Sequence, residues 1–384
     1  MPIKYYKTVM LILPFLWLTS CVDEFWPELT KYENLLVVDG GINNGPPPYT
    51  IKLSKSSALD SAKLVPFPGC IVSITASDGY KEILIEDEEG VYKTSVSGIQ
   101  GVAGLRYRLN IETPSGKTYE SSFDKIEKPV LIDNLYAEIE EHKVGGYEHP
   151  LQGYQFYLDT ETTSSDSTYF IWRMQATFHY QSEYYIHWYW QTHLERFIPT
   201  DSLYNCWTTY SLKDIYTYNT SSLTSNKLSG FPLNFVSTED RKLTVRYSLL
   251  VRQYSVNKTA YVFWNSLEKQ NADQGSLYSH QPYQIKGNVT NIKQPDEPVL
   301  GYFLVSGIDS KRIFVDRPDL HFYYSLCNIN AGHYKAYSDL GMGSPYDPPQ
   351  YIILYEGFRA VPGQPCADCR LRGGTIVKPD FWED

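Results

Sequence analysis

Short strands between residues 35 and 123 limit most strongly what this chain can fold into. Apolar and polar residues alternate with a period of two in runs such as 70–75 and 105–111, as in strands that have one buried face. Turn sequences at 77–79 and 114–116 separate the runs, and no helical period is present. About seven short strands at this spacing predict an N-terminal β-sandwich of the immunoglobulin or prealbumin type.

A second region begins after a charged segment, 124–129, that ends in proline. Residues 170–180 alternate as a long strand with one strongly apolar face, and residues 242–251 predict a further strand. This region is longer and more aromatic than the first. We therefore predict two domains, a β-sandwich at residues 32–128 and an aromatic-rich β domain at residues 129–384.

One amphipathic helix and one hairpin are predicted in the second domain. Ser255 is a suitable N-cap for the helix, and Gly275 ends the region. Between them, apolar side chains recur at helical spacing: Ala260, Tyr261, Trp264 and Leu267. This stripe predicts packing against the sheet rather than a ligand site. Residues 301–306 and 311–315 predict the two strands of the hairpin.

The first 21 residues have the pattern of a bacterial lipoprotein signal. Two lysines precede a short apolar stretch at 8–18, and Leu18-Thr19-Ser20-Cys21 places small residues before a cysteine. We predict a signal peptide at 1–20, lipidation of Cys21 and a tether at 21–31. An ordinary secretory signal is the alternative. Several acyl chains would anchor the protein firmly, because each buried methylene contributes about 0.8 kcal/mol.

The mature chain is acidic. Its formal net charge of −10 becomes −12 after cleavage, because residues 1–20 carry two positive charges, Lys4 and Lys7, and no negative ones. Nucleic-acid binding needs clustered Lys and Arg, so a nucleic-acid partner is not expected. No segment after Cys21 reaches the roughly 18 consecutive apolar residues of a membrane helix. The lipid is therefore the expected anchor.

Tyrosine is unusually frequent, with 34 residues in a chain that is 15% aromatic. Tyr and Trp suit half-buried β surfaces, and they also dominate recognition surfaces. The run 184–190 is aromatic on both faces, so it is either buried twice or exposed for a partner. Its aromatic members form the candidate recognition surface: Tyr184, Tyr185, Trp188, Tyr189 and Trp190.

Motifs for catalysis, metal binding or cofactor binding are missing from the sequence. There is no nucleophile elbow, no His-Glu-x-x-His and no glycine-rich phosphate or dinucleotide loop. His179, His187 and His193 follow no ligand spacing, and the acidic run 86–89 lacks the alternating ligands of a calcium loop. We expect no cofactor and no metal, and we assign no catalytic residue.

The cysteines predict disulfides. An exported bacterial protein folds in an oxidising compartment, where cysteines pair. The Cys366-x-x-Cys369 turn lacks the second half of a zinc site and the flanking strand and helix of a redox motif. We expect it to pair with Cys206 and Cys327, in a connectivity that the sequence leaves open. Cys70 remains, in an apolar strand, as a buried free thiol.

The C-terminal segments 366–374 and 378–382 resemble the tail of a family of Bacteroidota lipoproteins known as domain of unknown function 4249. The lipobox, the early β-sandwich and the segments 275–277, 287–289 and 300–303 are similar as well. The resemblance covers essentially all of the mature chain. It implies an accessory lipoprotein of a TonB-dependent outer-membrane receptor, and it brings no catalytic residue with it.

The lipoprotein signal and the missing catalytic motifs, together with the receptor association that the resemblance implies, predict a non-catalytic outer-membrane lipoprotein that helps a TonB-dependent receptor to capture or admit a nutrient. Asp23 and Glu24 resemble the export signal that sends such lipoproteins to the cell surface. Two alternatives come from other classes. One is a surface hydrolase acting on glycan or peptide, which needs only two well-placed carboxylates. The other is a structural adhesin or scaffold.

Overall fold

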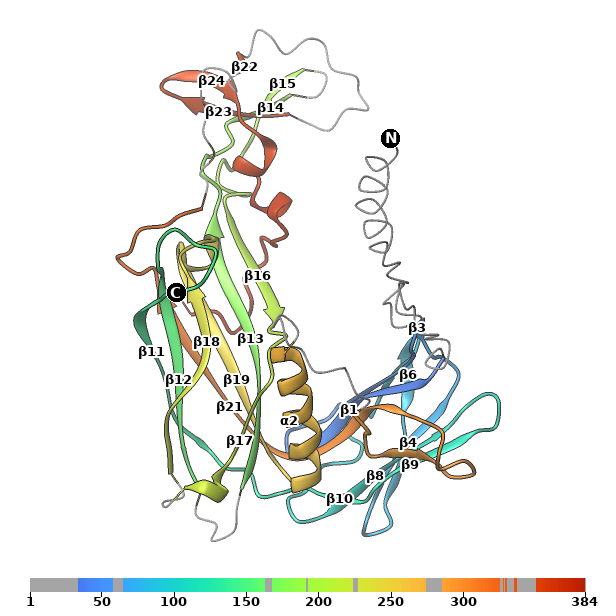
Figure 1. Ribbon diagram of the computed structural model, residues 1–384. Coiled ribbons are helices and arrows are strands. Elements are labelled where there is room, and N and C mark those ends of the chain that lie inside the picture. Colours follow the sequence, from blue (N-terminus) through green and yellow to red (C-terminus); the bar gives the residue numbers. More distant parts are fainter. Residues whose placement is uncertain are drawn as a thin grey trace, which may run out of the picture.

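A computed structural model of the protein describes residues 34–57, 65–162, 168–190, 193–223, 227–273, 285–324, 327, 329, 335–336 and 350–383. The chain is mainly β, with a single α-helix among these residues (Figure 1). This confirms the predicted fold class. Within the same residues, no helix is both long enough and apolar enough to cross a membrane.

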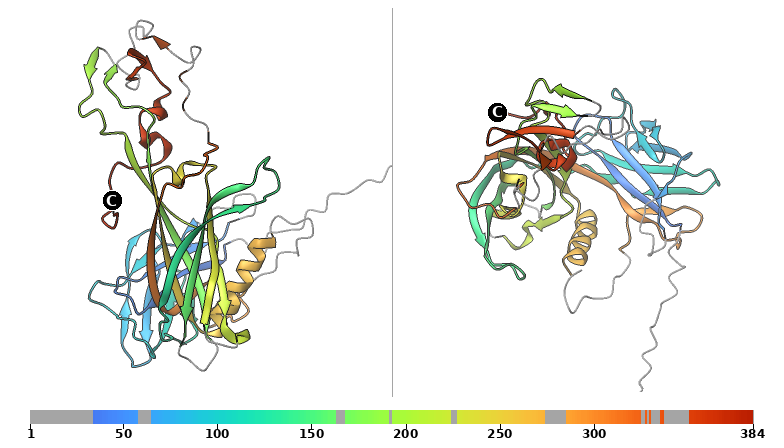
Figure 2. Two further views of the ribbon diagram at one scale, coloured as in Figure 1. Left: turned by 90° about the vertical axis from the view of Figure 1, so that its left-hand side faces the viewer. Right: turned by 90° about the horizontal axis from the view of Figure 1, so that it is seen from above.

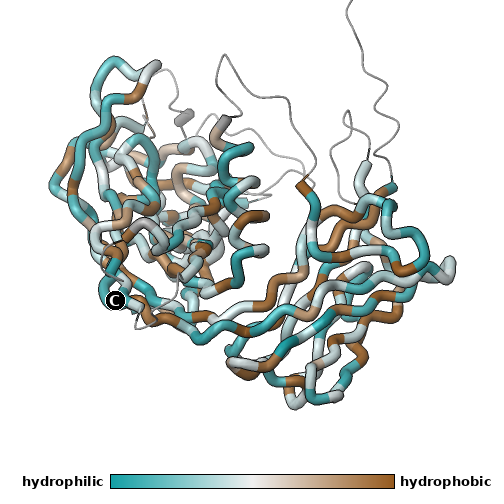
Figure 3. The backbone as a smooth tube through the Cα atoms, turned by 60° about the horizontal axis from the view of Figure 1, so that its bottom comes forward, coloured by the Kyte–Doolittle hydropathy of each residue, from teal (hydrophilic) through white to brown (hydrophobic). Residues whose placement is uncertain are grey.

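The N-terminal body is a sandwich of two antiparallel layers (Figure 1, lower right). One layer contains β1 (Leu36–Asn43), β2 (Thr50–Lys55), β3 (Val65–Pro66), β6 (Ile85–Glu88) and β7 (Val91–Lys93). The other contains β4 (Ile71–Ala76), β5 (Lys81–Ile83), β8 (Arg106–Glu112), β9 (Thr118–Ser121), β10 (Asp124–Lys125) and β20 (Val289–Asn291). Alternation along β8 buries Tyr107, Leu109 and Ile111, as period two requires. Figure 3 shows this alternation of hydrophobic and hydrophilic residues along the strands.

The second body is another pair of packed sheets. Its larger sheet contains β13 (Tyr169–Gln181), β16 (Asn205–Ser211), β17 (Tyr216–Asn219), β19 (Arg246–Val256) and β21 (Leu300–Asp316). The facing sheet contains β11 (Ile132–His142), β12 (Leu151–Glu161) and β18 (Lys227–Ser237). Phe156, Trp172 and Leu249 are fully buried between the two sheets. The apolar face predicted for residues 170–180 is therefore the face that packs into this core.

Strand β21 joins the two bodies into one continuous sheet. Its first half pairs in parallel with β1 and its second half pairs antiparallel with β19. The predicted hairpin at 301–306 and 311–315 is therefore wrong, because both halves belong to a single strand. Gly301 has a positive φ of 81°, and a Cβ there would overlap the carbonyl oxygen of Val38.

The core of the first body also includes residues from late in the chain. Val289, Val299, Phe303 and Val305 are buried among the residues of the N-terminal sandwich. The predicted domain boundary between residues 128 and 129 places all four in the second domain. Pairing between β1 and β21 brings this late segment back, which a linear reading of the chain does not reveal.

Helix α2 (Lys258–Asp273) covers the outer face of the larger sheet. Its Ala260 and Trp264 are buried, as the apolar stripe predicts. The predicted N-cap is wrong. Ser255 lies within β19, where its hydroxyl accepts a hydrogen bond from the backbone N–H of Val130 at 3.2 Å. Asn257 caps the helix instead, because its side-chain oxygen accepts the N–H of Ala260 at 2.8 Å.

A small sheet projects beyond the second body (Figures 1 and 2). It contains β14 (Trp188–Trp190), β15 (Leu194–Arg196), β22 (Lys335–Ala336), β23 (Gln350–Tyr355) and β24 (Phe358–Val361). Four short 3-10 helices complete the described elements: η4 (Thr220–Ser222), η5 (Arg241–Leu243), η7 (Gln364–Cys366) and η8 (Cys369–Arg372). The small sheet, the flanking residues 183–187 and 197–204, and η7 and η8 are together called the apex below.

Candidate ligand-binding site

The apex has a small core of its own. Strand β14 pairs with β15 on one side and with β23 on the other. Ile186, Ile353 and Ala360 are nearly or fully buried beneath this sheet. Few apolar residues take part, so burial alone fixes the apex less firmly than the two larger cores.

Two disulfides connect the apex to its surroundings. Cys206 of β16 is bonded to Cys369 of η8, and Cys327 is bonded to Cys366 of η7. The four cysteines predicted to pair are these four, and the structure supplies the connectivity that the sequence left open. Cys70 is a buried free thiol in the N-terminal sandwich. The first disulfide holds η8 against β16 of the larger sheet, and the second joins η7 to Cys327.

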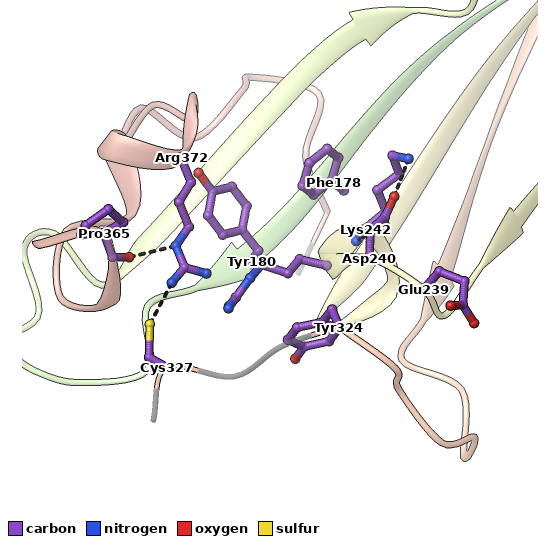
Figure 4. Close-up of a pocket in the computed structure, with 10 residues that line it drawn as sticks. Phe178, Tyr180, Glu239, Asp240, Lys242, Tyr324, Cys327, Pro365 and Arg372 are labelled. Carbon is purple, nitrogen blue, oxygen red and sulfur yellow. Dashed lines mark hydrogen bonds and ion pairs between the residues drawn. The ribbon is translucent and has the colours of Figure 1, made fainter. Parts of the chain in front are cut away.

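A pocket of about 560 Å³ lies where the apex meets the larger sheet (Figure 4). It is surrounded by the end of β13, the η5 turn, Tyr324, Cys327 and the η7–η8 segment. Its lining combines aromatic and charged side chains: Phe178, Tyr180, Glu239, Asp240, Arg241, Lys242, Tyr324, Cys327, Pro365 and Arg372. Ligand pockets in proteins have volumes of about 300–1,000 Å³, and this one falls within that range.

Two arginines of the pocket converge on one carboxylate. Arg241 and Arg372 both form ion pairs with Glu183, the second at 3.1 Å. Arg372 also donates to the carbonyl oxygen of Pro365 at 2.7 Å and to the sulfur of Cys327 at 3.0 Å. Burial lowers the pKa of Arg372; Arg241 also lowers it, while Glu183 opposes the shift. The guanidinium groups are thus held in place beside the disulfide.

The carboxylates that line the pocket have structural partners. Asp240 caps η5 by accepting the N–H of Lys242 at 2.8 Å, and it also pairs with the ammonium group of Lys242. Glu239 contacts His149 at 3.0 Å. Both carboxylates of the lining therefore have partners within the fold.

Aromatic rings form the apolar part of the lining. Tyr180 is buried and donates its hydroxyl hydrogen to the carbonyl oxygen of Cys369 at 2.6 Å. The ring of Tyr324 lies 4.7 Å from the guanidinium carbon of Arg241. Phe178 packs beside Tyr180 with ring centroids 5.6 Å apart. Rings next to fixed charges can hold a ligand that has an apolar ring and a polar edge.

The predicted recognition surface lies in the apex. Only Trp188, Tyr189 and Trp190 form a strand, and all three are half-buried, so the run is neither buried twice nor fully exposed. Arg359 lies over the ring of Trp188 at 4.5 Å, and the hydroxyl of Tyr189 hydrogen-bonds to Glu195.

The two tyrosines before this strand differ in exposure. Tyr185 is 47% exposed and stacks on Tyr204 at 4.2 Å. Tyr184 donates to the carbonyl oxygen of Cys327 at 3.2 Å, which links the run to the wall of the pocket.

The three histidines weighed as metal ligands lie in different surroundings. His179 stacks on Trp207 at 4.8 Å, His187 lies against Trp188 at 5.5 Å, and His193 pairs with Glu195 at 2.6 Å. A different group, Glu183 with Cys327 and Cys366, is compact enough for a metal ion. Its two sulfurs are joined in a disulfide, so they cannot act as thiolate ligands.

Sequence reasoning missed the charged part of the pocket. Glu183, Arg241 and Arg372 are far apart in the chain and belong to no motif. The only available signal was the position of Arg372 just after the Cys366-x-x-Cys369 turn. The predicted lipidation and export residues, Cys21, Asp23 and Glu24, lie outside the described residues.

Comparison with known proteins identifies a family. A family model described as Domain of unknown function (DUF4249) matches residues 22–312, about three quarters of the chain. The match ends within β21, so the cysteine-containing tail that carried much of the resemblance lies beyond it. A search of curated proteins finds no match to this chain.

Proposed function

Because the chain belongs to the family Domain of unknown function (DUF4249), and membership assigns no activity, we propose its function from its own residues. It is a non-catalytic lipoprotein, anchored in the outer membrane through Cys21 and facing the cell exterior. It serves as an accessory subunit of a TonB-dependent receptor in nutrient capture or uptake. The apex is the part that contacts the ligand or the receptor.

One observation carries this proposal. The pocket of about 560 Å³ lies at the base of the apex, and it combines three aromatic rings with fixed charges. The disulfides and the Glu183 ion pairs set its walls before any ligand arrives. A preformed site loses little conformational freedom on binding, which favours recognition.

The charged groups of the pocket support binding rather than catalysis. Hydrolysis of a glycan uses two carboxyl groups that flank the bond, one as general acid and the other as base or nucleophile. Glu239 and Asp240 instead hold His149 and the η5 turn. A broad substrate screen of the purified protein is expected to give no turnover. Hydrolysis that Glu239→Gln or Asp240→Asn abolishes would replace this proposal with the hydrolase alternative.

The lipid anchor makes a weak protein contact sufficient. Anchoring both partners in one membrane turns their association into an encounter at high effective concentration. We expect the neighbouring receptor to copurify with the lipoprotein from outer membranes solubilised in mild detergent. Recovery of the lipoprotein alone under these conditions would contradict the accessory role.

The apex can be tested directly in the same experiment. The double variant Tyr185→Ala and Trp188→Ala removes aromatic surface from the apex and should reduce receptor recovery. The matched control removes exposed apolar surface from the sandwich, Ile83→Ala with Ile85→Ala, where the two residues are 63% and 66% exposed. If both double variants lose the receptor equally, the apex makes no specific contact with it.

Placement on the cell surface has its own test. Cys21→Ala should prevent lipid attachment, whereas Asp23→Ala with Glu24→Ala should keep the lipid and leave the protein on the periplasmic face. Protease added to intact cells distinguishes the two faces. Wild-type protein that resists digestion until the cells are lysed would refute the surface location and leave only the anchor.

A further inference from the structure

Three arginines share the outer face of the larger sheet, between α2 and the C-terminal tail. Arg173 of β13 is paired directly with Arg252 of β19. Arg312 of β21 is paired with Leu250, so it is the diagonal neighbour of Arg252 on the same face. Helix α2 limits this patch at one end, where Trp264 packs on Arg173 at 4.3 Å. Phe381 of the tail limits it at the other end, 3.6 Å from Arg312.

The three like charges are not neutralised by neighbouring carboxylates. In the part of the chain that the structure describes, none of these guanidinium groups has a carboxylate oxygen within 4.0 Å. Like charges on directly paired residues destabilise a sheet. Burial lowers the pKa of Arg312, and the charge of Arg252 lowers it further. A bound negative charge would reduce this repulsion.

A small pocket lies at the Arg173 end of the patch. Its volume is about 160 Å³, and its lining contains Asp39, Gly40, Gly41, Asn43, Arg173, Tyr254, Trp264, Leu304 and Ser306. Two donors of this lining, Nε of Arg173 and Nε1 of Trp264, are buried and have no hydrogen-bond partner among the described residues. Trp264 is only 8% exposed. Buried donors without a partner are costly, and an acceptor in the pocket would satisfy them.

We propose that this pocket and the adjoining arginines form an oxyanion-binding site, which takes a phosphate, sulfate or carboxylate group of a small ligand. The planar guanidinium group of Arg173 presents donors that match such oxygens, and the indole N–H of Trp264 adds another. Arg252 and Arg312 add positive charge from the next two strands. The pocket has room for one anionic group, so the remainder of the ligand lies outside it.

One residue opposes an anion at this site. Asp39 is exposed and lines the same pocket, so its carboxylate repels a bound oxyanion. Removing that charge should therefore strengthen binding, whereas removing an arginine should weaken it. Two substitutions with opposite expected effects separate a specific site from general loss of structure.

The test is calorimetric titration of the full-length lipoprotein in detergent at low salt, with inorganic phosphate, sulfate and citrate in separate experiments. We expect saturable binding of at least one of the three, and the preferred anion identifies the chemical group. Arg173→Gln and Arg252→Gln should each weaken binding about tenfold, whereas Asp39→Asn should strengthen it. Arg252→Lys keeps the charge and should retain part of the affinity.

Arg106→Gln is the matched control, because Arg106 is exposed at the start of β8 in the N-terminal sandwich and does not line this pocket. It should leave the affinity unchanged. Absence of saturable binding for all three anions overturns the proposal, as does equal binding by wild type, Arg173→Gln and Arg252→Gln. Because Asp39 is exposed, Asp39→Asn remains informative even if an arginine variant fails to fold.

Discussion

The N-terminal sandwich and the apex are both β structures, yet different forces hold them. In the sandwich, Val72, Ile74 and Leu109 are completely buried in one extended core, and no disulfide is present among its described residues. The apex has only a small core, and two disulfides join its η7–η8 segment to the rest of the protein. Burial stabilises the first region, and covalent bonds constrain the second.

This difference explains where recognition surfaces can form. A sheet with an extended core uses its aromatic residues internally, as Tyr92 and Tyr107 do in the sandwich. A region fixed by disulfides can leave aromatic side chains half-exposed without losing its shape, as Tyr185 and Trp188 show. Under the proposed function, stability and recognition are therefore assigned to different regions of this molecule.

Breaking the disulfide between Cys206 and Cys369 should give the largest contrast between the two regions. Replacing Cys206 and Cys369 by serine opens a loop with a sequence separation of 163 residues. Loss of a native disulfide costs about 2–5 kcal/mol, and here the cost should fall on the apex. Hydrogen exchange should rise in the apex and stay unchanged in β4 and β8. Equal exchange in both regions would show that they are not separately stabilised.

A core substitution should give the reverse contrast. Leu109→Ala removes a completely buried side chain from the sandwich and should lower the free energy of unfolding by about 2–5 kcal/mol. Ile353→Ala removes an equally buried side chain from the apex, where the disulfides remain. Urea denaturation should show a smaller change for the apex variant. A larger change for Ile353→Ala would contradict the comparison.

Removing a single tyrosine hydroxyl should also affect stability differently in the two regions, with a smaller effect. In the sandwich, the hydroxyl of Tyr92 accepts the N–H of Cys70 at 2.9 Å and donates to the carbonyl oxygen of Phe67 at 3.1 Å. Tyr92→Phe should cost about 1–2 kcal/mol, because the buried N–H of Cys70 loses its partner. Tyr185→Phe in the apex should cost almost nothing. Thermal unfolding of both variants tests this difference.

The smallest expected effect is a change in the stability of the sandwich at acidic pH. Backbone N–H groups of Gly90 and Gly69 hydrogen-bond to Glu86 and hold its pKa below the ordinary value of 4.5. A lowered pKa stabilises the folded sandwich above the unfolded-state pKa, and this contribution disappears as the pH falls through the folded-state pKa. Wild type should therefore lose slightly more stability than Glu86→Gln below about pH 4.5. If the free energy of unfolding falls equally with pH in wild type and Glu86→Gln, the Glu86 carboxylate makes no such contribution.

Local patterns predicted those parts of the fold that depend on neighbouring residues. The alternation at 105–111 marks β8, and the apolar stripe marks the buried face of α2. Long-range pairing was not predictable in this way. Residues 300–316 looked like a hairpin because polar residues interrupt the apolar pattern, yet β1 and β19 hold the whole segment as one strand.

The same limit on long-range prediction applies to the candidate site. The sequence identified the cysteines and the aromatic run, because each is visible as a local feature. It could not identify Glu183 with Arg241 and Arg372, since only the folded chain brings these three together. The cross-strand pair of Arg173 and Arg252 was equally hidden, because strand register places two arginines 79 positions apart opposite each other.

We propose that the receptor is contacted through the apex while the sandwich provides support. Hydrogen exchange on the lipoprotein, alone and in the complex copurified with its receptor, measures this directly. We expect protection on binding at residues 183–204 and 350–372, with no change at residues 71–76 and 106–112. Protection confined to the sandwich strands, with the apex exchanging as in the free protein, would contradict it.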